Sequence, residues 1–215
     1  MNALEPALAG GTLERPLLAP RFAALAAEVE ELPLEAFLAD LGRRARIYAD
    51  LARSLRVDVL FVNDADEEPD VLADLLQRVR ATVPTTLGAV VTGPATRGDM
   101  PSVLAAARAV AEAGAEVVLV RETVPLADNY PRLSNPLWGS LKFFRAVGVL
   151  LAPNPLAAPG PYLPCLSVAA DVSHALAVAP GAASAAGRAT ALITHTEDLA
   201  GHVPVRELQA AIARL

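Results

Sequence analysis

Cysteine and lysine are nearly missing from this sequence. Cys165 is the only cysteine and Lys142 the only lysine. A single cysteine excludes an internal disulfide framework, so we expect a reducing, cytoplasmic compartment. The formal net charge is −6, and binding to phosphate backbones needs clustered lysine and arginine. Nucleic acid is therefore not an expected partner.

Long apolar runs are also absent, although 53% of the residues are hydrophobic. The richest stretch, at 146–170, is interrupted by five prolines, so no membrane span is predicted. The first residues lack a basic patch followed by an apolar segment, so no signal peptide is predicted either. We expect a single domain over 1–215, with 1–14 as a loose lead-in.

Helical and strand patterns alternate along the chain. Apolar residues recur at helical spacing over 33–55, and VDVLFVND at 57–64 is a continuous apolar run that ends in polar residues, which is typical of a buried parallel strand. The same patterns predict further helices at 68–81, 99–113, 136–146, 172–178 and 205–215. They predict further strands at 15–20, 85–92, 116–120, 147–152, 163–169 and 189–193.

Strands that alternate with helices predict a parallel sheet with right-handed crossovers. An open doubly wound sheet and a (β/α) barrel both satisfy this pattern. No GxGxxG or GxxxxGK[ST] motif follows a strand, which counts against an open sheet that binds nucleotides. The predicted fold is α/β: a compact or incomplete (β/α) TIM-type barrel with parallel strands, one strand short of the usual eight.

Motifs for metal binding and for a serine nucleophile are missing. His174, His195 and His202 show no HxH or HxxxH spacing, and there is no second cysteine. The chain also lacks a GxSxG elbow. We therefore predict no metal site.

Polar side chains follow the predicted strands, at the edge where α/β proteins gather functional groups. Arg21 follows the first strand, Asp64 ends the second, and Arg121 and Glu122 follow the fourth. His195 comes directly after the last apolar run. An imidazole in that place can donate or accept a proton in a cleft.

Each candidate also has a purely structural interpretation. Arg121 and Glu122 are equally consistent with a local ion pair, and His195 with an imidazole bonded to a neighbouring carboxylate. Tyr130, in the loop after the fourth strand, either lines a pocket or packs. Asp99 is interpreted as a helix cap.

Six segments have the pattern of strands and turns in one family of barrels: RPLLAPR at 15–21, VDVLFVND at 57–64, TGPAT at 92–96, AGAEVV at 113–118, SNPLW at 134–138 and ITHTEDLAGHVPVRELQAAI at 193–212. Together they resemble the uroporphyrinogen decarboxylase superfamily, which also includes cobalamin-linked and cobalamin-independent methyltransferases. The resemblance places Arg21 at the family's first-strand arginine, Asp64 at its aspartate and His195 at its histidine.

In the decarboxylases, this resemblance implies a (β/α)₈ barrel and a reaction without cofactor. Arginines hold the substrate carboxylates, since guanidinium groups bind carboxylates in a bidentate manner. An acid can stabilise the charge that develops as carbon dioxide departs. His195 and Asp64 are therefore the expected catalytic residues. The expected substrate-binding residues are Arg21, Arg121, Glu122 and Tyr130.

The chain also departs from the family. Leu25 stands where the decarboxylases carry a second arginine, and one cysteine cannot supply the His/Cys zinc set of the methyltransferase branch. The predicted function is a divergent, metal-free decarboxylase-like lyase for a small molecule with carboxylate groups. The alternatives are a non-catalytic, accessory small-molecule-binding barrel that forms a homodimer, and a methyltransferase-related barrel.

Overall fold

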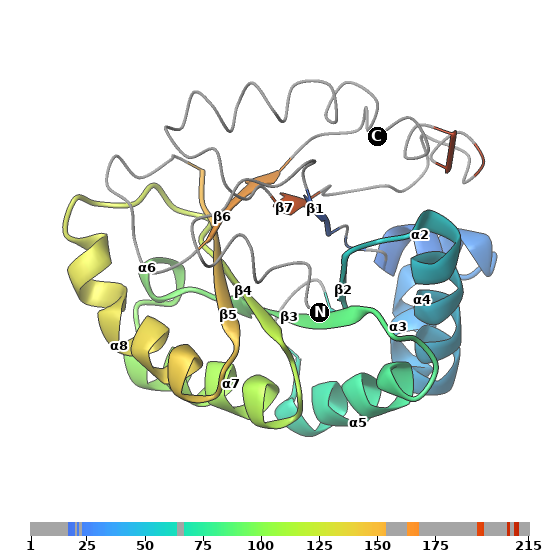
Figure 1. Ribbon diagram of the computed structural model, residues 1–215, viewed down its shortest axis with the longest axis horizontal. Coiled ribbons are helices and arrows are strands. Elements are labelled where there is room, and N and C mark those ends of the chain that lie inside the picture. Colours follow the sequence, from blue (N-terminus) through green and yellow to red (C-terminus); the bar gives the residue numbers. More distant parts are fainter. Residues whose placement is uncertain are drawn as a thin grey trace.

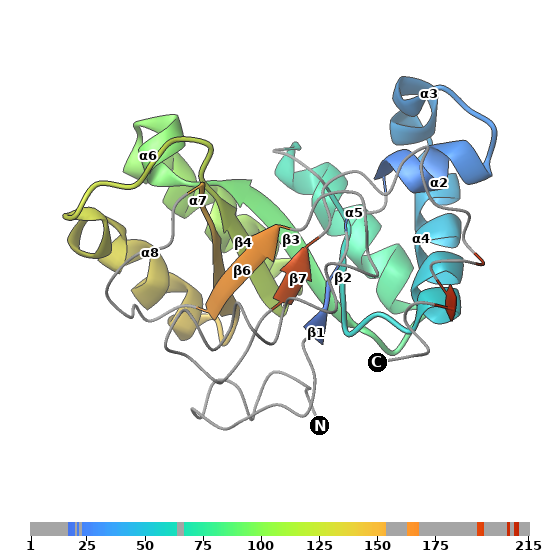
Figure 2. The ribbon, with the colours of Figure 1, turned by 90° about the horizontal axis from the view of Figure 1, so that it is seen from above.

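A curved parallel sheet with helices on its outer side forms the molecule (Figures 1 and 2). The computed structural model describes residues 17–19, 21, 23–63, 67–153, 163–167, 193–195, 206 and 209–210. In chain order the strands are β1 (Leu17–Leu18), β2 (Val59–Phe61), β3 (Thr86–Thr92), β4 (Val117–Arg121), β5 (Val147–Leu151), β6 (Leu163–Ser167) and β7 (Ile193–His195).

All strand pairings are parallel, in the order β1-β7-β6-β5-β4-β3-β2. Beyond β1, Arg21 forms one isolated parallel bridge to Phe61 of β2, the strand at the other edge of this order. Sequential strands are neighbours from β2 to β7, as expected for repeated strand–helix units. The sheet is thus an incomplete (β/α) barrel, which confirms the predicted fold class.

The helices of the described residues are α2 (Ala23–Val29), α3 (Leu34–Ala39), α4 (Leu41–Leu55), α5 (Pro69–Arg80), α6 (Pro94–Arg97), α7 (Met100–Glu112) and α8 (Tyr130–Phe143). Helix α4 contacts α5, α5 contacts α7, and α7 contacts α8, so these four helices follow one another around the outside of the sheet (Figure 1). No helix in the described part of the chain is both long enough and apolar enough to cross a membrane.

Alternate residues of a strand face opposite sides of the sheet. One buried cluster contains alternate strand residues and lies inside the curve of the sheet: Leu17, Ala19, Val59, Phe61, Val90, Val117, Leu119, Val147, Val149 and Leu151. The intervening positions, such as Leu60, Val91 and Val120, belong to the larger cluster shared with the helices. A Cβ at Gly88 would lie 2.6 Å from the Phe61 ring, so glycine leaves the room that this aromatic side chain fills.

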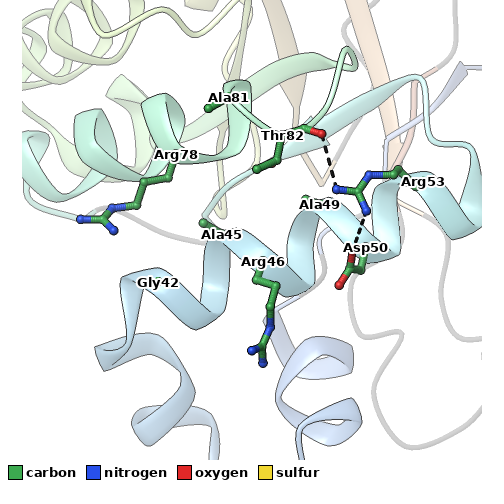
Figure 3. A pocket seen from close by; sticks show the side chains of 9 residues that line it. All are labelled: Gly42, Ala45, Arg46, Ala49, Asp50, Arg53, Arg78, Ala81 and Thr82. Carbon is green, nitrogen blue, oxygen red and sulfur yellow. Dashed lines mark hydrogen bonds and ion pairs between the residues drawn. The ribbon is translucent and has the colours of Figure 1, made fainter.

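Helices α4 and α5 meet through small residues. Ala45, Ala49 and Ala81 line a cavity of about 390 Å³ between them (Figure 3). Arg53 closes one end of it, where its guanidinium donates to the Thr82 carbonyl and forms an ion pair with Asp50. The small alanine side chains therefore leave this space between the two helices unfilled.

Several predicted boundaries were wrong. The helix predicted over 33–55 is interrupted at Asp40, whose side chain accepts a hydrogen bond from the Arg43 amide and caps α4. Pro136 was interpreted as the first residue of a helix, yet it lies inside α8. Helices α2 and α6 were not predicted, and β7 extends to His195, two residues beyond the predicted end. Residues 189–192 of the strand predicted at 189–193 lie outside the described residues.

Other boundaries are close to the prediction. Helix α7 ends as expected next to Gly114, which has a φ of 104° that glycine adopts without strain. Asp99 occupies the N-cap of α7 and accepts a hydrogen bond from the Ser102 hydroxyl. The helix predicted at 172–178 lies outside the described residues, and residues 206 and 209–210 of the helix predicted at 205–215 are helical.

Replacing Arg56 with glycine is expected to stabilise the protein. Arg56 ends α4 in the left-handed conformation (φ 49°, ψ 46°), and its side chain is exposed. That conformation costs an L-residue roughly 1–2 kcal/mol, while glycine adds an unfolded-state cost of roughly 0.5–1 kcal/mol. Urea denaturation of Arg56→Gly should show a gain of about 0.5–1 kcal/mol.

The matched control is Ser54→Gly, two residues earlier, within α4 and in helical geometry. It should lose about 0.5 kcal/mol, because glycine is a poor helix former. Equal losses for both variants would contradict the argument from the left-handed geometry.

Candidate functional site at the carboxyl ends of the strands

Because all strands are parallel, their carboxyl ends meet at one edge of the sheet. Arg121 is the last residue of β4, in register with Thr92 of β3 and Leu151 of β5. His195 is the last residue of β7, in register with Ser167 of β6. Arg21 lies beyond β1 and bridges to Phe61 of β2. Three of the predicted site residues therefore belong to the same edge.

The alternation of the strands assigns both arginines to the inner side. Arg121 follows Val117 and Leu119 at two-residue steps, and both of these belong to the inner cluster. Arg21 follows Leu17 and Ala19 of that cluster in the same way. Arg21 is 9% exposed and Arg121 is half-buried. The inner side of the sheet thus carries Arg21 and Arg121 at the carboxyl ends of its strands. We call this end of the barrel its carboxyl mouth.

The two predicted catalytic residues are only partly covered by the structure. Asp64 lies outside the described residues. The backbone of His195 is described as part of β7, whereas its side chain is not. Their roles as proton-handling groups therefore stay predictions.

Glu122 is buried and is bound by the turn after β3. Its Oε1 accepts from the Ala95 amide at 3.0 Å, and its Oε2 accepts from the Thr96 amide and the Thr96 hydroxyl, each at 2.7 Å. The side chain is 3% exposed. Both oxygens already have donors, so this carboxylate holds α6 in place, an arrangement that differs from the direct ligand contact predicted for it.

Gly93 is required by this contact. A Cβ built at Gly93 would collide with the Glu122 carboxyl group. The Gly93 amide also donates to the Arg121 carbonyl at 2.8 Å. The Gly-Pro-x-Thr pattern therefore has a physical reason here: glycine gives room, proline starts the short helix, and threonine supplies the hydroxyl donor.

Tyr130 starts helix α8 and is 1% exposed. It belongs to the cluster between sheet and helices, together with Leu126 and Leu137. This position matches the packing alternative more closely than the pocket-lining one. The helical pattern could have placed Tyr130 on the buried face, had the helix been started before Pro136.

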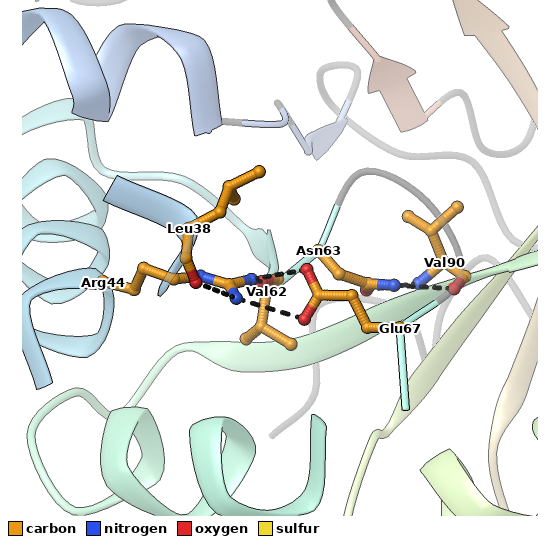
Figure 4. A network of polar contacts seen from close by, with 6 residues as sticks. All are labelled: Leu38, Arg44, Val62, Asn63, Glu67 and Val90. Carbon is orange, nitrogen blue, oxygen red and sulfur yellow. Dashed lines mark hydrogen bonds and ion pairs between the residues drawn. The ribbon is translucent and has the colours of Figure 1, made fainter. Parts of the chain in front are cut away.

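A buried arginine that the sequence analysis did not single out lies near the end of β2. Arg44 of α4 is 1% exposed. Its guanidinium donates to both oxygens of Glu67, at 2.8 and 3.1 Å, and to the carbonyls of Leu38 and Val62 (Figure 4). Desolvation lowers the pKa of Arg44, but the hydrogen bonds and charge of Glu67, with help from Tyr48, outweigh it and raise the pKa above its ordinary value.

Asn63 extends the pairing of β2 with β3 through its side chain. Its amide group donates to the Val90 carbonyl and accepts from the Val90 amide, both at 2.8 Å (Figure 4). Asn63 and Glu67 flank residues 64–66 in the sequence, and each is held by hydrogen bonds, to Val90 and to Arg44 respectively. A cavity of about 920 Å³ adjoins this network and is lined by Arg44, Glu67 and residues of α5 and α7.

Among the described residues there is no group of three or more histidine, cysteine, aspartate and glutamate side chains that could hold a metal ion.

Comparisons with known proteins support the fold and show no family. No protein-family model matches the chain, and no curated protein matches it. Among solved structures, homocysteine methyltransferase MmuM from Escherichia coli aligns with a TM-score of 0.60 and 12% identity, over 100% of both chains. A truncated 3-deoxy-D-arabino-heptulosonate 7-phosphate synthase from Thermotoga maritima aligns with a TM-score of 0.50 and 10% identity, over 93% of this chain and 84% of that one.

The network around Arg44 predicts unequal effects of two neighbouring glutamates. Glu67→Ala leaves a buried guanidinium without its carboxylate and should destabilise the protein by about 2–4 kcal/mol in urea denaturation. Glu68→Ala removes an exposed side chain and should change stability by less than about 0.5 kcal/mol.

A double variant separates the buried charge from simple loss of packing. Arg44→Met combined with Glu67→Leu should be less destabilised than Glu67→Ala alone, because no unpaired charge remains. If the double variant is the less stable of the two, the cost does not come from the unpaired guanidinium.

Proposed function

We propose that this chain is a small-molecule-binding (β/α) barrel that takes a ligand with carboxylate groups through Arg21 and Arg121. The finer proposal is a divergent, metal-free uroporphyrinogen decarboxylase-like lyase. The observation that supports it most is the inner position of both arginines at the carboxyl mouth. Guanidinium groups next to an apolar wall bind carboxylates strongly, because little water competes there.

Decarboxylation gives the predicted residues distinct tasks. The carbon–carbon bond to the departing carboxylate breaks, carbon dioxide leaves, and the electron pair stays on the ligand carbon until a proton arrives. The arginines would hold the carboxylates that remain. His195, at the end of β7, and Asp64 would supply the proton and stabilise the developing charge.

A non-catalytic accessory barrel is the second candidate. The edge strand β2 is connected to the chain beyond β1 by one isolated bridge among the described residues, and incompletely paired edges are commonly covered by a partner. A homodimer would cover the incompletely paired edges of β1 and β2. Light scattering that gives the mass of one chain at micromolar concentration would count against the homodimer.

Ligand binding tests the general proposal. Pyromellitate, a benzene ring with carboxylates around it, should bind to the full chain in isothermal titration calorimetry. Arg121→Ala should weaken this binding at least about tenfold, because one charged bidentate contact is lost. The tetramethyl ester of pyromellitate should not bind.

Arg108→Ala is the matched control for Arg121→Ala. Arg108 lies on α7 at the exposed outer side, where it donates to the Ser140 hydroxyl. This variant should bind pyromellitate as the unaltered chain does. Equal affinities for all three proteins would refute the assignment of Arg121.

Turnover tests the finer proposal. Once a substrate has been found by screening carboxylated compounds for release of carbon dioxide, His195→Ala and Asp64→Asn should each abolish turnover with an unchanged circular dichroism spectrum. Full activity in both variants would show that these residues are not the catalytic ones.

A further inference from the structure

We propose that Glu122 is a positioning residue that fixes the direction of the neighbouring Arg121 side chain. This inference rests on the proposed function, in which Arg121 contacts the ligand. Adjacent residues of a strand project to opposite sides. Arg121 therefore takes the inner side of the sheet, and Glu122 takes the outer side, where it meets the turn that begins α6.

The bonds of Glu122 tie the end of β4 to the α6 turn. Its carboxylate accepts from two amides and one hydroxyl of the α6 turn. The same Thr96 hydroxyl oxygen accepts from the Thr123 amide at 2.7 Å. The chain on the far side of Glu122 is thus bound to the same turn, and the end of β4 is held beyond its last strand residue.

The backbone around Arg121 is held from both neighbouring strands. The Gly93 amide donates to the Arg121 carbonyl, and the Glu122 amide donates to the Leu151 carbonyl, each at 2.8 Å. The peptide group between Arg121 and Glu122 therefore has a hydrogen bond on each side. Residues 123–125 are exposed, so the Glu122 carboxylate is the last buried anchor before the chain leaves the sheet.

A carboxylate is the group that suits this place. It only accepts hydrogen bonds, and all three of its partners are donors. A glutamine of the same shape would turn an N–H group toward one set of these donors. Glu122→Gln keeps the side-chain volume but places a donor where only acceptors fit. This variant should therefore loosen the end of β4 and let the Arg121 side chain adopt several directions.

The first test uses the ligand-free protein. The side-chain N–H cross-peak of Arg121 in the NMR spectrum should be single and sharp in the unaltered chain and should broaden or split in Glu122→Gln. Glu116→Gln is the matched control, since Glu116 precedes the same strand and pairs at the surface with Arg80. An Arg121 cross-peak that is unchanged in Glu122→Gln would overturn the proposal.

A second pair of variants covers the case in which Glu122→Gln does not fold. Thr96→Val removes the hydroxyl bonded to Glu122 and to the Thr123 amide, whereas Thr96→Ser keeps it. The Arg121 cross-peak should broaden in Thr96→Val and stay sharp in Thr96→Ser. The same sharp peak in both would also overturn the proposal.

The last test shows whether Glu122 acts through Arg121. Glu122→Gln should weaken pyromellitate binding about tenfold in the unaltered background and have no further effect in Arg121→Ala. Equal weakening in both backgrounds would mean that Glu122 acts independently, against the proposal. If Arg121→Ala alone binds normally, the proposed function fails, and the cross-peak still decides the positioning role.

Discussion

The two-residue alternation of parallel strands is the constraint on which this structure depends. Successive valine and leucine side chains of a strand face the inner side of the sheet and the helix layer alternately. The inner cluster and the cluster shared with the helices therefore form from the same short apolar strands. At the end of β4 it separates a cation from an anion: Arg121 falls on the inner side and Glu122 on the outer side. A pair of residues that looks like an ion pair in the sequence is thereby divided between the mouth of the barrel and its supporting turn.

Side chains supply hydrogen bonds where the backbone pairing of the strands ends. Asn63 pairs with both polar groups of Val90 beyond β2, and Glu122 accepts from the α6 turn beyond β4. Arg44 donates to the Val62 carbonyl just beyond β2 and to the Leu38 carbonyl in the last turn of α3. Buried backbone groups require partners, and irregular segments cannot supply them from a ladder. The polar residues at the strand ends therefore stabilise these ends, in addition to any part that they take in the proposed ligand binding.

The sequence pattern predicted the strands well because continuous apolar runs have few alternatives in an α/β chain. It failed at Pro136, since proline suits a helix start, whereas here the buried Tyr130, Ser134 and Leu137 place that proline inside α8. The burial of Arg44 was not predicted, because an arginine within an amphipathic helix is usually exposed. Its burial depends on Glu67, which follows 23 residues later in the sequence. The position of Arg121 at the carboxyl end of a strand followed from the strand pattern, but the role of Glu122 depends on a turn that no local pattern specifies.

The arrangement of the two arginines also restricts the ligand that the proposed function requires. Strands β1 and β4 are not neighbours in the sheet, so Arg21 and Arg121 enter the mouth from different parts of the curve. A small monocarboxylate would reach one guanidinium and leave the other cation with no share in binding. A ligand with carboxylates on separate sides of a ring or chain can contact both, and its negative charges also reduce the repulsion between the two cations. Under the proposed function, the aliphatic residues next to the two arginines would contact only the apolar part of such a ligand, which would favour a compact ring with carboxylates at its rim over a polar chain.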